Sequence, residues 1–477
     1  MAALGIALAV FYLYNLDGVG VLGPDEPRYA AIGRAMARTG DLITPELWGS
    51  PWFEKPPLLY WITALGTAVG LGPDLCGRLP VAVCSLLFLG LCSVLVKREF
   101  DGGAAVVSTS LLATSAGWVV YSSLCLTDLP LAVFFSLAVL LSLSLLRREP
   151  DAKGLPLRFL GIGFFLGLAT LAKGLVPLAL ALPFGWFLRG YWRKWWLAAV
   201  ACLLTALPWY SAVYWRNGSP FIEEFFVKHH FQRVYSAALL HVQPPYYYVP
   251  VFLGAVFPWT PLLALFAKRK GTWDRRRSFL LAVVLFGLLF FSISRNKLPG
   301  YLLPLLPSFF VLLGAQFERD KIPALSRVWL LPSAVLIAAI PLLAPILTSS
   351  LALGRITFAD VTHVTHLEIA CIAMPLVLAM LPERFFPGLL LVLCMACEGM
   401  YLKSVAYPVL DSRVSARSLW HAIAPIADQT CDGGTDRDWI YGLDYYRGAS
   451  YPACGTGAYK YVIRTHGHEV PKLERLR

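Results

Sequence analysis

The stretch GPDEPRYAAIGRAMARTGDLITPELWGSPWFEKPPLLYW occupies residues 23–61 and directly follows the first hydrophobic segment of the chain. Between residues 26 and 37 its apolar side chains recur at helical spacing, with Arg34 and Arg38 on the opposite side. This pattern predicts an amphipathic helix at a membrane surface, whose small and apolar residues we expect to face lipid. The many charges beside it predict more than a solvated loop, and we interpret the stretch as a reactive site at the membrane surface.

The composition is that of a membrane protein. Of 477 residues, 57% are hydrophobic and 15% are charged, and the mean hydropathy is +0.63. A soluble domain has about 45–50% apolar and about 25% charged residues. The excess runs along the whole chain, and the first twenty residues lack the basic start and cleavage site of a signal peptide. We therefore expect a multi-pass protein with a retained first span.

About thirteen apolar stretches approach the roughly 20 residues that a bilayer requires. They are 2–20, 76–96, 104–123, 128–146, 158–174, 176–189, 196–215, 246–267, 278–294, 300–315, 328–349, 366–381 and 386–405. Basic clusters fall between alternate pairs, at 97–100, 147–150, 189–196, 268–277, 318–321 and 382–385. The positive-inside rule places these loops in the cytoplasm. The charged stretch, the loop at 126–128, the loop 216–245 and the carboxyl tail then face outward, and segment 58–70 forms a short helix at the outer surface.

Further polar residues lie on the same outward side. Asp128 begins a span, where an ionisable group marks a site, although Asp before Leu-Pro is equally typical of a helix start. Arg295 and Lys297 depart from the positive-inside rule, and a phosphate group is their natural partner. The sequence contains no P-loop motif and no GxGxxG motif after a predicted strand, so it indicates neither a nucleotide cofactor nor a nucleic-acid partner.

Several motifs resemble one known family in order and spacing. They are DEPRYA, WFEKPPLLYW, LTDLPLAVFF, LAKGLVPL, PFIEEFFVKHHFQR, QPPYYYVPVFLGAVFPW and SRNKLPGYLLP. They are similar to the membrane glycosyltransferases related to the transferase that adds 4-amino-4-deoxy-L-arabinose to lipid A, with protein O-mannosyltransferases as more distant relatives. The resemblance is strong over residues 1–320, weaker over 321–405 and poor in the tail.

The resemblance implies an all-α class C glycosyltransferase fold with about 13 transmembrane helices, outward interfacial helices and a site that faces the periplasm. The sugar donor would be carried on polyprenyl (undecaprenyl) phosphate. The implied catalytic residues are Asp25 and Asp128. The cations implied to bind the donor phosphate are Lys55, Arg233, Lys297 and Arg295. The residues implied to shape the pocket are Glu26, Arg28, Tyr29, Tyr60 and Tyr301.

The resemblance implies no required cofactor, but it suggests a zinc ion. Glu54 and His230 match residues that hold zinc in a relative. Two ligands are too few for a structural zinc site, which has about four. A solvated His229–His230 pair at the membrane surface is the alternative.

Three functions remain open at this point. The first is transfer of aminoarabinose to a lipid A phosphate, and the second is transfer of a mannosyl or other hexosyl group to protein hydroxyls from the same lipid donor. The third is a transporter or flippase, which should show repeated halves and broken helices near the middle of the bilayer. We find no internal repeat, which favours an enzyme in the bacterial inner membrane.

The tail has a different composition. We expect residues 1–406 to form the transmembrane domain, with an outward catalytic loop over 21–75, and residues 407–477 to form a small mixed α/β periplasmic domain with short strands. Cys431 and Cys454 are the two cysteines in this outward tail, where a disulfide is permitted. The sequence alone leaves their pairing open.

Overall fold

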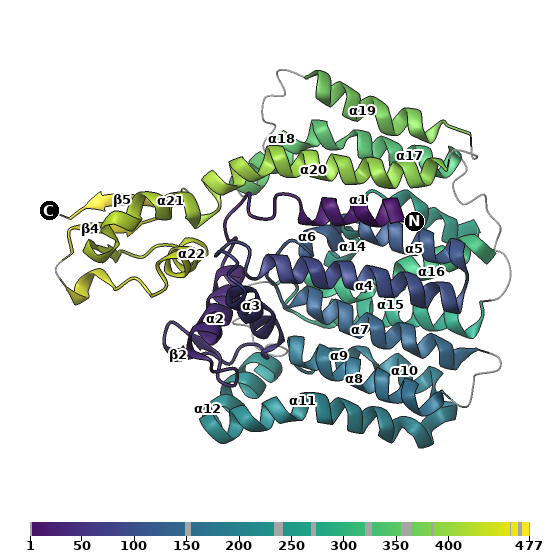
Figure 1. Cartoon of the computed structure of the whole chain (residues 1–477), viewed down its shortest axis with the longest axis horizontal. Helices are drawn as coiled ribbons and strands as arrows, with labels where there is room; N and C mark the ends of the chain where they lie inside the picture. Colours follow the sequence, from purple (N-terminus) through teal and green to yellow (C-terminus); the bar gives the residue numbers. More distant parts are fainter. Residues whose placement is uncertain are drawn as a thin grey trace.

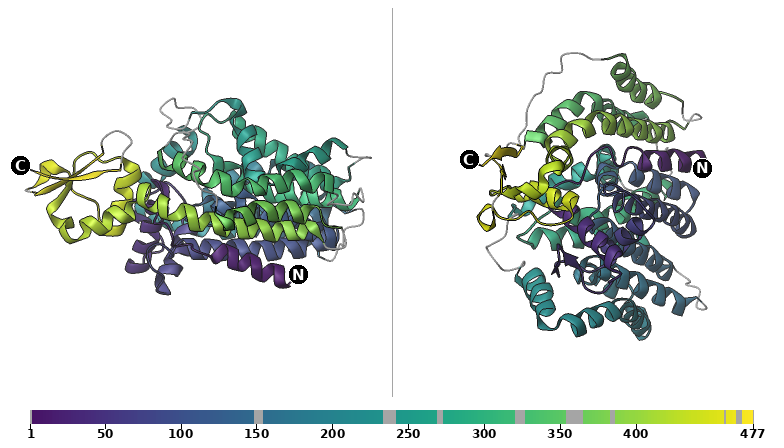
Figure 2. Two further views of the ribbon diagram at one scale, coloured as in Figure 1. Left: turned by 90° about the horizontal axis from the view of Figure 1, so that it is seen from above. Right: turned by 60° about the vertical axis from the view of Figure 1, so that its left-hand side comes forward.

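The computed structural model describes residues 2–147, 154–232, 242–268, 273–319, 327–353, 365–382, 386–457, 459–465 and 470–476. Helices run side by side in one bundle, and a small domain at the carboxyl end of the chain projects from one end of it (Figure 1). The view from above shows this domain extending beyond the helix ends (Figure 2). The bundle core is made of Leu, Phe, Val and Ala side chains contributed by nearly all of its helices.

Seven helices in the described ranges are long and apolar enough to cross a membrane, and an eighth crossing results if one bent pair is a single span. The seven are α4 (Arg78–Glu99), α7 (Asp128–Leu143) with η1 (Ser144–Leu146), α8 (Leu155–Lys173), η2 (Arg189–Lys194) with α11 (Trp195–Asn217), α15 (Arg275–Ile293), η6 (Pro299–Leu305) with α16 (Leu306–Arg319), and α20 (Pro387–Arg413). The bent pair is α17 (Arg327–Ala338) and α18 (Ile340–Leu353), with 52° between them.

Other predicted spans are shorter or broken. The short helices of the bundle are α1 (Ala2–Leu13), α5 (Gly102–Ala113), α6 (Ala116–Tyr121), α9 (Val176–Leu180), α10 (Leu182–Phe187), η4 (Pro245–Tyr247), α14 (Tyr248–Val256), η5 (Thr260–Lys268) and α19 (His366–Ala379). Prolines account for two of the breaks, because proline lacks the amide hydrogen that a continuing helix needs. Pro183 follows the break between α9 and α10, and the Phe257–Pro258 peptide between α14 and η5 is cis. The predicted count of thirteen spans is therefore not confirmed.

The charged stretch folds as predicted into a helix, α2 (Asp25–Thr39), followed by the hairpin β1 (Glu46–Leu47) and β2 (Ser50–Pro51) and by the short helix α3 (Leu58–Ala68). The expectation that its apolar face meets lipid was wrong. Ile32 and Met36 are buried in the core because α3 covers that face. Gly33 permits the close approach, since a Cβ atom there would lie 2.5 Å from Cβ of Thr63.

Within the described residues, basic side chains from several of these loops lie at the end of the bundle away from α2 and α3 (Figure 1). Arg147 donates from Nε to Glu99 Oε2 at 2.9 Å, and Arg276 lies 4.0 Å from the same oxygen. Arg275 donates to the carbonyl of Phe187 at 2.7 Å. Cationic loops that are far apart in the sequence thus share one end, which we call the basic end. The opposite end, which carries α2, α3 and the small domain, is called the site end.

The small domain has its own core, which begins at Ala416. Helix α20 continues to Arg413, somewhat beyond the boundary expected at residue 406. The domain contains α21 (Ala416–Ile423), η8 (Ala424–Gln429), α22 (Arg437–Arg447), η9 (Cys454–Thr456) and a sheet in the order β3 (Thr430–Asp432), β4 (Tyr461–Arg464), β5 (Lys472–Arg475). Strands β3 and β4 are parallel, and β4 and β5 are antiparallel. The domain is therefore mixed α/β, while its position in the periplasm stays a prediction.

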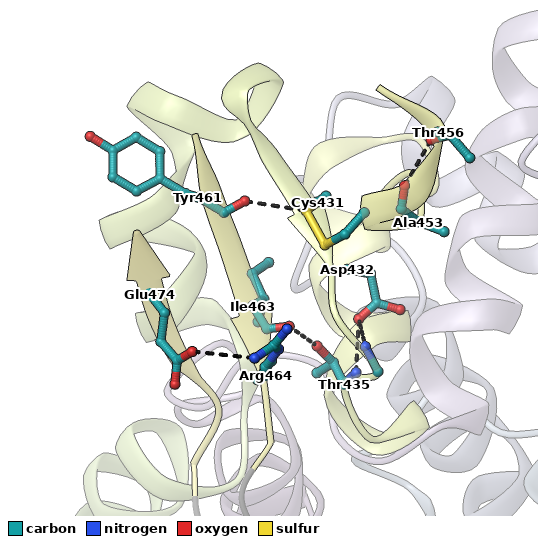
Figure 3. The surroundings of a disulfide bond; sticks show 11 residues. Cys431, Asp432, Thr435, Ala453, Thr456, Tyr461, Ile463, Arg464 and Glu474 are labelled. Atoms are coloured by element: carbon teal, nitrogen blue, oxygen red, sulfur yellow. Dashed lines mark hydrogen bonds and ion pairs between the residues drawn. A yellow bond between two sulfur atoms is a disulfide. The ribbon is translucent and has the colours of Figure 1, made fainter. Parts of the chain in front are cut away.

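A disulfide joins Cys431 on β3 to Cys454 on η9, with Cα atoms 4.9 Å apart (Figure 3). Cys431 lies in the buried part of the sheet. The bond ties the segment after α22 to the parallel strand pair, and it settles the pairing that the sequence left open.

The small domain is docked on the site end by polar contacts. Arg417 pairs with Asp74 and Asp411, each at 3.0 Å. The Tyr446 hydroxyl donates to Asp74 at 2.6 Å, and the Tyr445 hydroxyl donates to the carbonyl of Pro73 at 2.5 Å. These contacts place α22 directly against α2.

Candidate active site

Glu26 is directed into the protein by Arg78, a residue that the sequence analysis did not consider. Both side chains are 2% exposed, and the guanidinium forms two hydrogen bonds of 2.7 Å to the carboxylate. Glu26 also accepts from the amides of Leu22 at 2.8 Å and Cys125 at 3.0 Å. With its oxygens satisfied in this way, Glu26 fixes the start of α2 to α4 and to the segment before α7.

Asp25, Arg28, Glu54 and Lys55 form a row of alternating charges at the site end. Arg28 pairs with Asp25 one turn earlier on α2, and its Nη1 lies 3.1 Å from Oε2 of Glu54. Oε1 of Glu54 lies 3.0 Å from Nζ of Lys55. The side chains of Glu54 and Lys55 are 6% and 11% exposed, whereas Asp25 is 41% exposed. Asp25 is thus the carboxylate that a molecule arriving from solution would meet.

Aromatic rings hold this row in place. The Arg28 guanidinium carbon lies 5.3 Å from the centre of the Trp52 ring and 5.2 Å from that of Tyr441 on α22, which is cation–π distance. The small domain therefore supplies one side of the site. The ring centres of two buried tyrosines of the same region, Tyr29 and Tyr60, lie 6.0 Å apart. Burial, reinforced by the Glu54 carboxylate, raises the pKa of both phenols, so they remain neutral donors at neutral pH.

Asp128 belongs to a second group of polar residues. Its Oδ1 lies 2.6 Å from Nζ of Lys173, the last residue of α8, and both side chains are 13% exposed. The Lys173 ammonium also lies 4.8 Å from the centre of the Tyr301 ring. Gly300 allows the chain to pass here, because a Cβ atom would lie 2.5 Å from the Asp128 carboxylate. The structure thus brings Asp128 and Tyr301 together through a lysine that was not predicted.

The remaining predicted cations are placed differently. Lys297 is 4% exposed, and its Nζ donates to the carbonyls of Gln243, at 3.1 Å, and of Ser294. Arg295 beside it is exposed. Arg233 lies outside the described residues, and so does the side chain of His230. Lys297 therefore supports the loop before η6, while the positions of Arg233 and His230 relative to Lys55 stay predictions.

The described residues alone do not form a zinc site. Within these ranges, no three His, Cys, Asp or Glu side chains are grouped closely enough to hold a metal ion. Glu54 is engaged by Arg28 and Lys55 instead. A structural zinc ion takes about four ligands, so the Glu54–His230 pair remains a prediction that rests on resemblance.

Lys173 and Glu224 were not predicted as site residues, but the structure makes both of them candidates for the site. Lys173 lies in the motif LAKGLVPL at the end of a span, where a lysine is commonly explained as reaching toward the interface. Glu224 lies on η3 (Ile222–Gln232), a π-helix that follows α12 (Ser219–Phe221). Burial raises the pKa of Glu224, the nearby Lys228 opposes the shift, and the Glu54 carboxylate adds to it.

The sequence matches known proteins over part of its length. Residues 54–215 match the family model of dolichyl-phosphate-mannose-protein mannosyltransferases. An undecaprenyl phosphate-alpha-4-amino-4-deoxy-L-arabinose arabinosyl transferase of Pseudomonas aeruginosa (strain UCBPP-PA14) is 36% identical over 328 residues, which are 65% of this chain and 58% of that protein. A transferase of the same name from Pseudomonas fluorescens (strain Pf-5) is 32% identical over 345 residues, which are 67% of this chain and 56% of that protein. The chain thus spans little more than half the length of these relatives.

The fold matches solved structures over almost the whole chain. ArnT from Cupriavidus metallidurans bound to undecaprenyl phosphate superposes with a TM-score of 0.75 at 24% identity, covering 97% of this chain and 93% of that one. The archaeal oligosaccharyltransferase AglB from Archaeoglobus fulgidus gives a TM-score of 0.53 at 13% identity, covering 97% and 69%. This multi-pass membrane protein is therefore similar in sequence to the aminoarabinose transferases and, over residues 54–215, to the protein mannosyltransferases, and its fold is that of these membrane glycosyltransferases.

Proposed function

We propose that the chain is a glycosyltransferase that moves a sugar from undecaprenyl phosphate to an envelope acceptor, with aminoarabinose as the sugar and a lipid A phosphate as the acceptor. The observation that carries the proposal is the row Asp25–Arg28–Glu54–Lys55, which unites an accessible carboxylate with two cations at the site end. Named relatives with this activity support the choice of donor, sugar and acceptor.

The reaction exchanges one bond for another at the anomeric carbon of the donor sugar. An oxygen of the acceptor attacks this carbon, the bond to the carrier phosphate breaks, and its electron pair leaves on the phosphate. The growing negative charge on the carrier needs cations that are already in position. Lys55 is held by Glu54 for this role, and Arg28 lies on the far side of the same carboxylate. Positive charge that develops on the sugar is stabilised by a nearby carboxylate, a role for Asp25.

The site end is proposed to face the periplasm. The basic end gathers Arg147, Arg275 and Arg276, and such residues are retained in the cytoplasm during insertion. The donor carrier would then reach Lys55 from the outer leaflet. The thirteen crossings remain part of this proposal, with broken helices such as α9–α10 and α14–η5 each counted as one crossing.

Protein hydroxyls are the second candidate acceptor, because the family model that matches residues 54–215 is that of protein mannosyltransferases. A serine or threonine hydroxyl must lose a proton as it attacks, whereas a lipid A phosphate is already anionic. Asp25 suits both reactions, so the acceptor must be identified directly. A transporter is disfavoured because the candidate charges in the described residues collect at one end of the bundle.

The test compares membranes from cells with and without the gene. Mass spectrometry should find lipid A carrying aminoarabinose only when the gene is present, and purified protein should transfer the sugar from synthetic undecaprenyl phosphate-aminoarabinose to lipid A. If lipid A is unchanged without the gene and a protein-bound glycan is lost instead, the acceptor is a protein hydroxyl and not a lipid A phosphate.

A further inference from the structure

A separate pocket lies on the opposite face of α2 from the bundle core. It has a volume of about 260 Å³ and is enclosed by α2, the β1–β2 hairpin and α22 with the residues after it. The side chains that give it chemical character are Arg34, Arg38, Glu46, Trp48 and Tyr445. None of them belongs to the charged row or to the Asp128 group.

Trp48 is held in an unusual backbone conformation at the tip of this hairpin. Its φ is +50° and that of Gly49 is +83°. Two-residue hairpin turns with both φ angles positive strongly favour Asn-Gly or Asp-Gly, and a bulky residue in this region is strained. Such strain persists where surrounding structure fixes it, and it is concentrated at ligand-binding and active sites. The strained tryptophan presents a large aromatic surface to the pocket.

Two arginines on α2 give the pocket its charge. Arg34 and Arg38 are four residues apart and therefore lie on the same side of the helix. The Arg34 guanidinium is already oriented, since its carbon lies 4.9 Å from the Tyr445 ring centre and its Nη1 lies 3.5 Å from the Tyr445 carbonyl. Arg38 is exposed. Among the residues that line the pocket, Glu46 is the one acidic side chain, so the lining carries a net positive charge.

Aromatic rings connect this pocket to the candidate active site. The Trp48 ring centre lies 5.6 Å from that of Tyr441, and Tyr441 stacks on the Arg28 guanidinium at 5.2 Å. Arg28 in turn pairs with Asp25. A molecule in the pocket would therefore be separated from the charged row by a single layer of aromatic side chains.

We propose that this pocket, formed by α2, the β1–β2 hairpin and α22, binds a phosphate-bearing saccharide of the glycolipid acceptor. Arg34 and Arg38 bind a phosphate group, for which guanidinium has matching geometry. Trp48 packs against the carbon–hydrogen face of the attached sugar ring, and Glu46 accepts a hydrogen bond from its hydroxyl or amino group. This inference rests on the proposed function and identifies where its acceptor docks before transfer.

The experiment measures binding, without turnover, to the full-length protein in lipid nanodiscs. The probes are lipid A, lipid A from which the phosphates have been removed, undecaprenyl phosphate, and inorganic phosphate. The variant is Arg34→Gln/Arg38→Gln. The matched control is Arg216→Gln, an exposed arginine that pairs with Asp41 outside the pocket. We expect the double variant to lose at least about tenfold in lipid A affinity, since it removes two guanidinium groups that would form charge-assisted hydrogen bonds to the phosphate.

The same variant should bind dephosphorylated lipid A and undecaprenyl phosphate as the wild type does, and the control should bind all probes normally. Wild-type affinity of the double variant for lipid A would overturn the proposal. A parallel loss of undecaprenyl phosphate binding would also overturn it, because the arginines would then serve the donor. Displacement of lipid A by an equal concentration of inorganic phosphate would show that the saccharide contributes nothing, which overturns the docking role.

A second variant separates binding from folding. Trp48→Gly suits a positive φ and removes the aromatic wall, so we expect a folded protein with lowered lipid A affinity. Unchanged affinity would contradict the role of Trp48. A wild type that binds lipid A here and yet transfers no aminoarabinose would contradict the proposed function while supporting the docking site, so the two failures can be told apart.

Discussion

The Nζ atom of Lys173 at the end of α8 lies 2.6 Å from Oδ1 of Asp128 at the start of α7. Both side chains are largely buried, and the lysine also faces the Tyr301 ring at 4.8 Å. An ion pair of this kind is costly to break on one side, because the remaining charge stays buried without compensation. The pair therefore holds the ends of two spans and positions Asp128 at the candidate site.

The first prediction follows from this pair. Lys173→Met should lower the free energy of unfolding by about 3–5 kcal/mol, the usual cost of removing one partner of a buried ion pair. Asp128→Asn/Lys173→Met should recover much of this loss, because no unpaired charge remains. Unfolding of the purified proteins in detergent measures both effects. If the losses of the single variants Lys173→Met and Asp128→Asn simply add in the double variant, the two groups are not coupled.

The second prediction concerns Asp25. Asp25→Asn keeps the shape of the side chain and removes its charge, and we expect turnover to fall by about 10²-fold or more, the scale of a positioned acid–base group. Donor binding should stay near normal, because Lys55 and Glu54 are untouched. The control is Asp41→Asn, another carboxylate of the same stretch, which pairs with Arg216. A folded Asp25→Asn protein that transfers sugar at the wild-type rate would rule out the catalytic role.

The third prediction is that replacing Lys55 changes the kinetics in a different way from replacing Asp25. Lys55 would contact the carrier phosphate both before and during the reaction, so Lys55→Ala should raise the apparent KM for the donor as well as lower turnover. Isothermal binding of undecaprenyl phosphate would separate the two effects. Lys97→Ala is the control, since Lys97 is exposed at the basic end. Unaltered donor affinity in Lys55→Ala would argue against contact with the phosphate.

The fourth prediction is a pH dependence of the small domain. Asp444 on α22 is 4% exposed, and burial raises its pKa from 3.8 to about 7, although the amide of Tyr451 donates to it at 2.8 Å. The folded domain therefore binds this proton more tightly than the unfolded chain does. This contribution to stability is complete below about pH 4, is lost as the pH rises toward 7, and changes no further above that value.

Hydrogen exchange of residues 437–447 in the full-length protein should show the effect as faster opening from pH 4 to 7. Its size is up to roughly 4 kcal/mol, since one pKa unit corresponds to about 1.4 kcal/mol. Asp444→Asn should flatten the profile while keeping an oxygen for the Tyr451 amide. Asp428→Asn serves as the control because that side chain is 98% exposed. An unchanged slope in Asp444→Asn would assign the pH dependence to another group.

The sequence predicted the elements of the site better than their environment. The motifs around Asp25 and Lys55 placed both residues at one surface, and the helix over 26–37 was confirmed as α2. Its apolar face could not be assigned to lipid or to protein from periodicity, because α3 comes from a later segment and covers it. Glu26 was expected in the pocket, yet it pairs with Arg78, which is 52 positions away. A contact between residues so far apart in the sequence produces no local sequence pattern from which it could be predicted.

Arg78 is the subject of the last prediction, because it fixes the geometry from which Asp25 and Arg28 project. Its guanidinium holds both oxygens of Glu26 and also donates to the carbonyls of Leu16, Val19 and Gly20, so that the loop before α2 is tied to α4. Arg78→Met should cost about 3–5 kcal/mol, since Glu26 would remain buried without its cation. Arg78→Lys should restore little, because an ammonium group has three donors and cannot reproduce the planar fork. Arg78→Met/Glu26→Gln should recover stability without recovering turnover, since no buried charge remains but the loop is no longer held by the guanidinium. Thermal unfolding and sugar transfer measured on the same preparations distinguish these results. An Arg78→Lys protein with wild-type stability and wild-type turnover would show that charge alone suffices and that the fork geometry does not position the site.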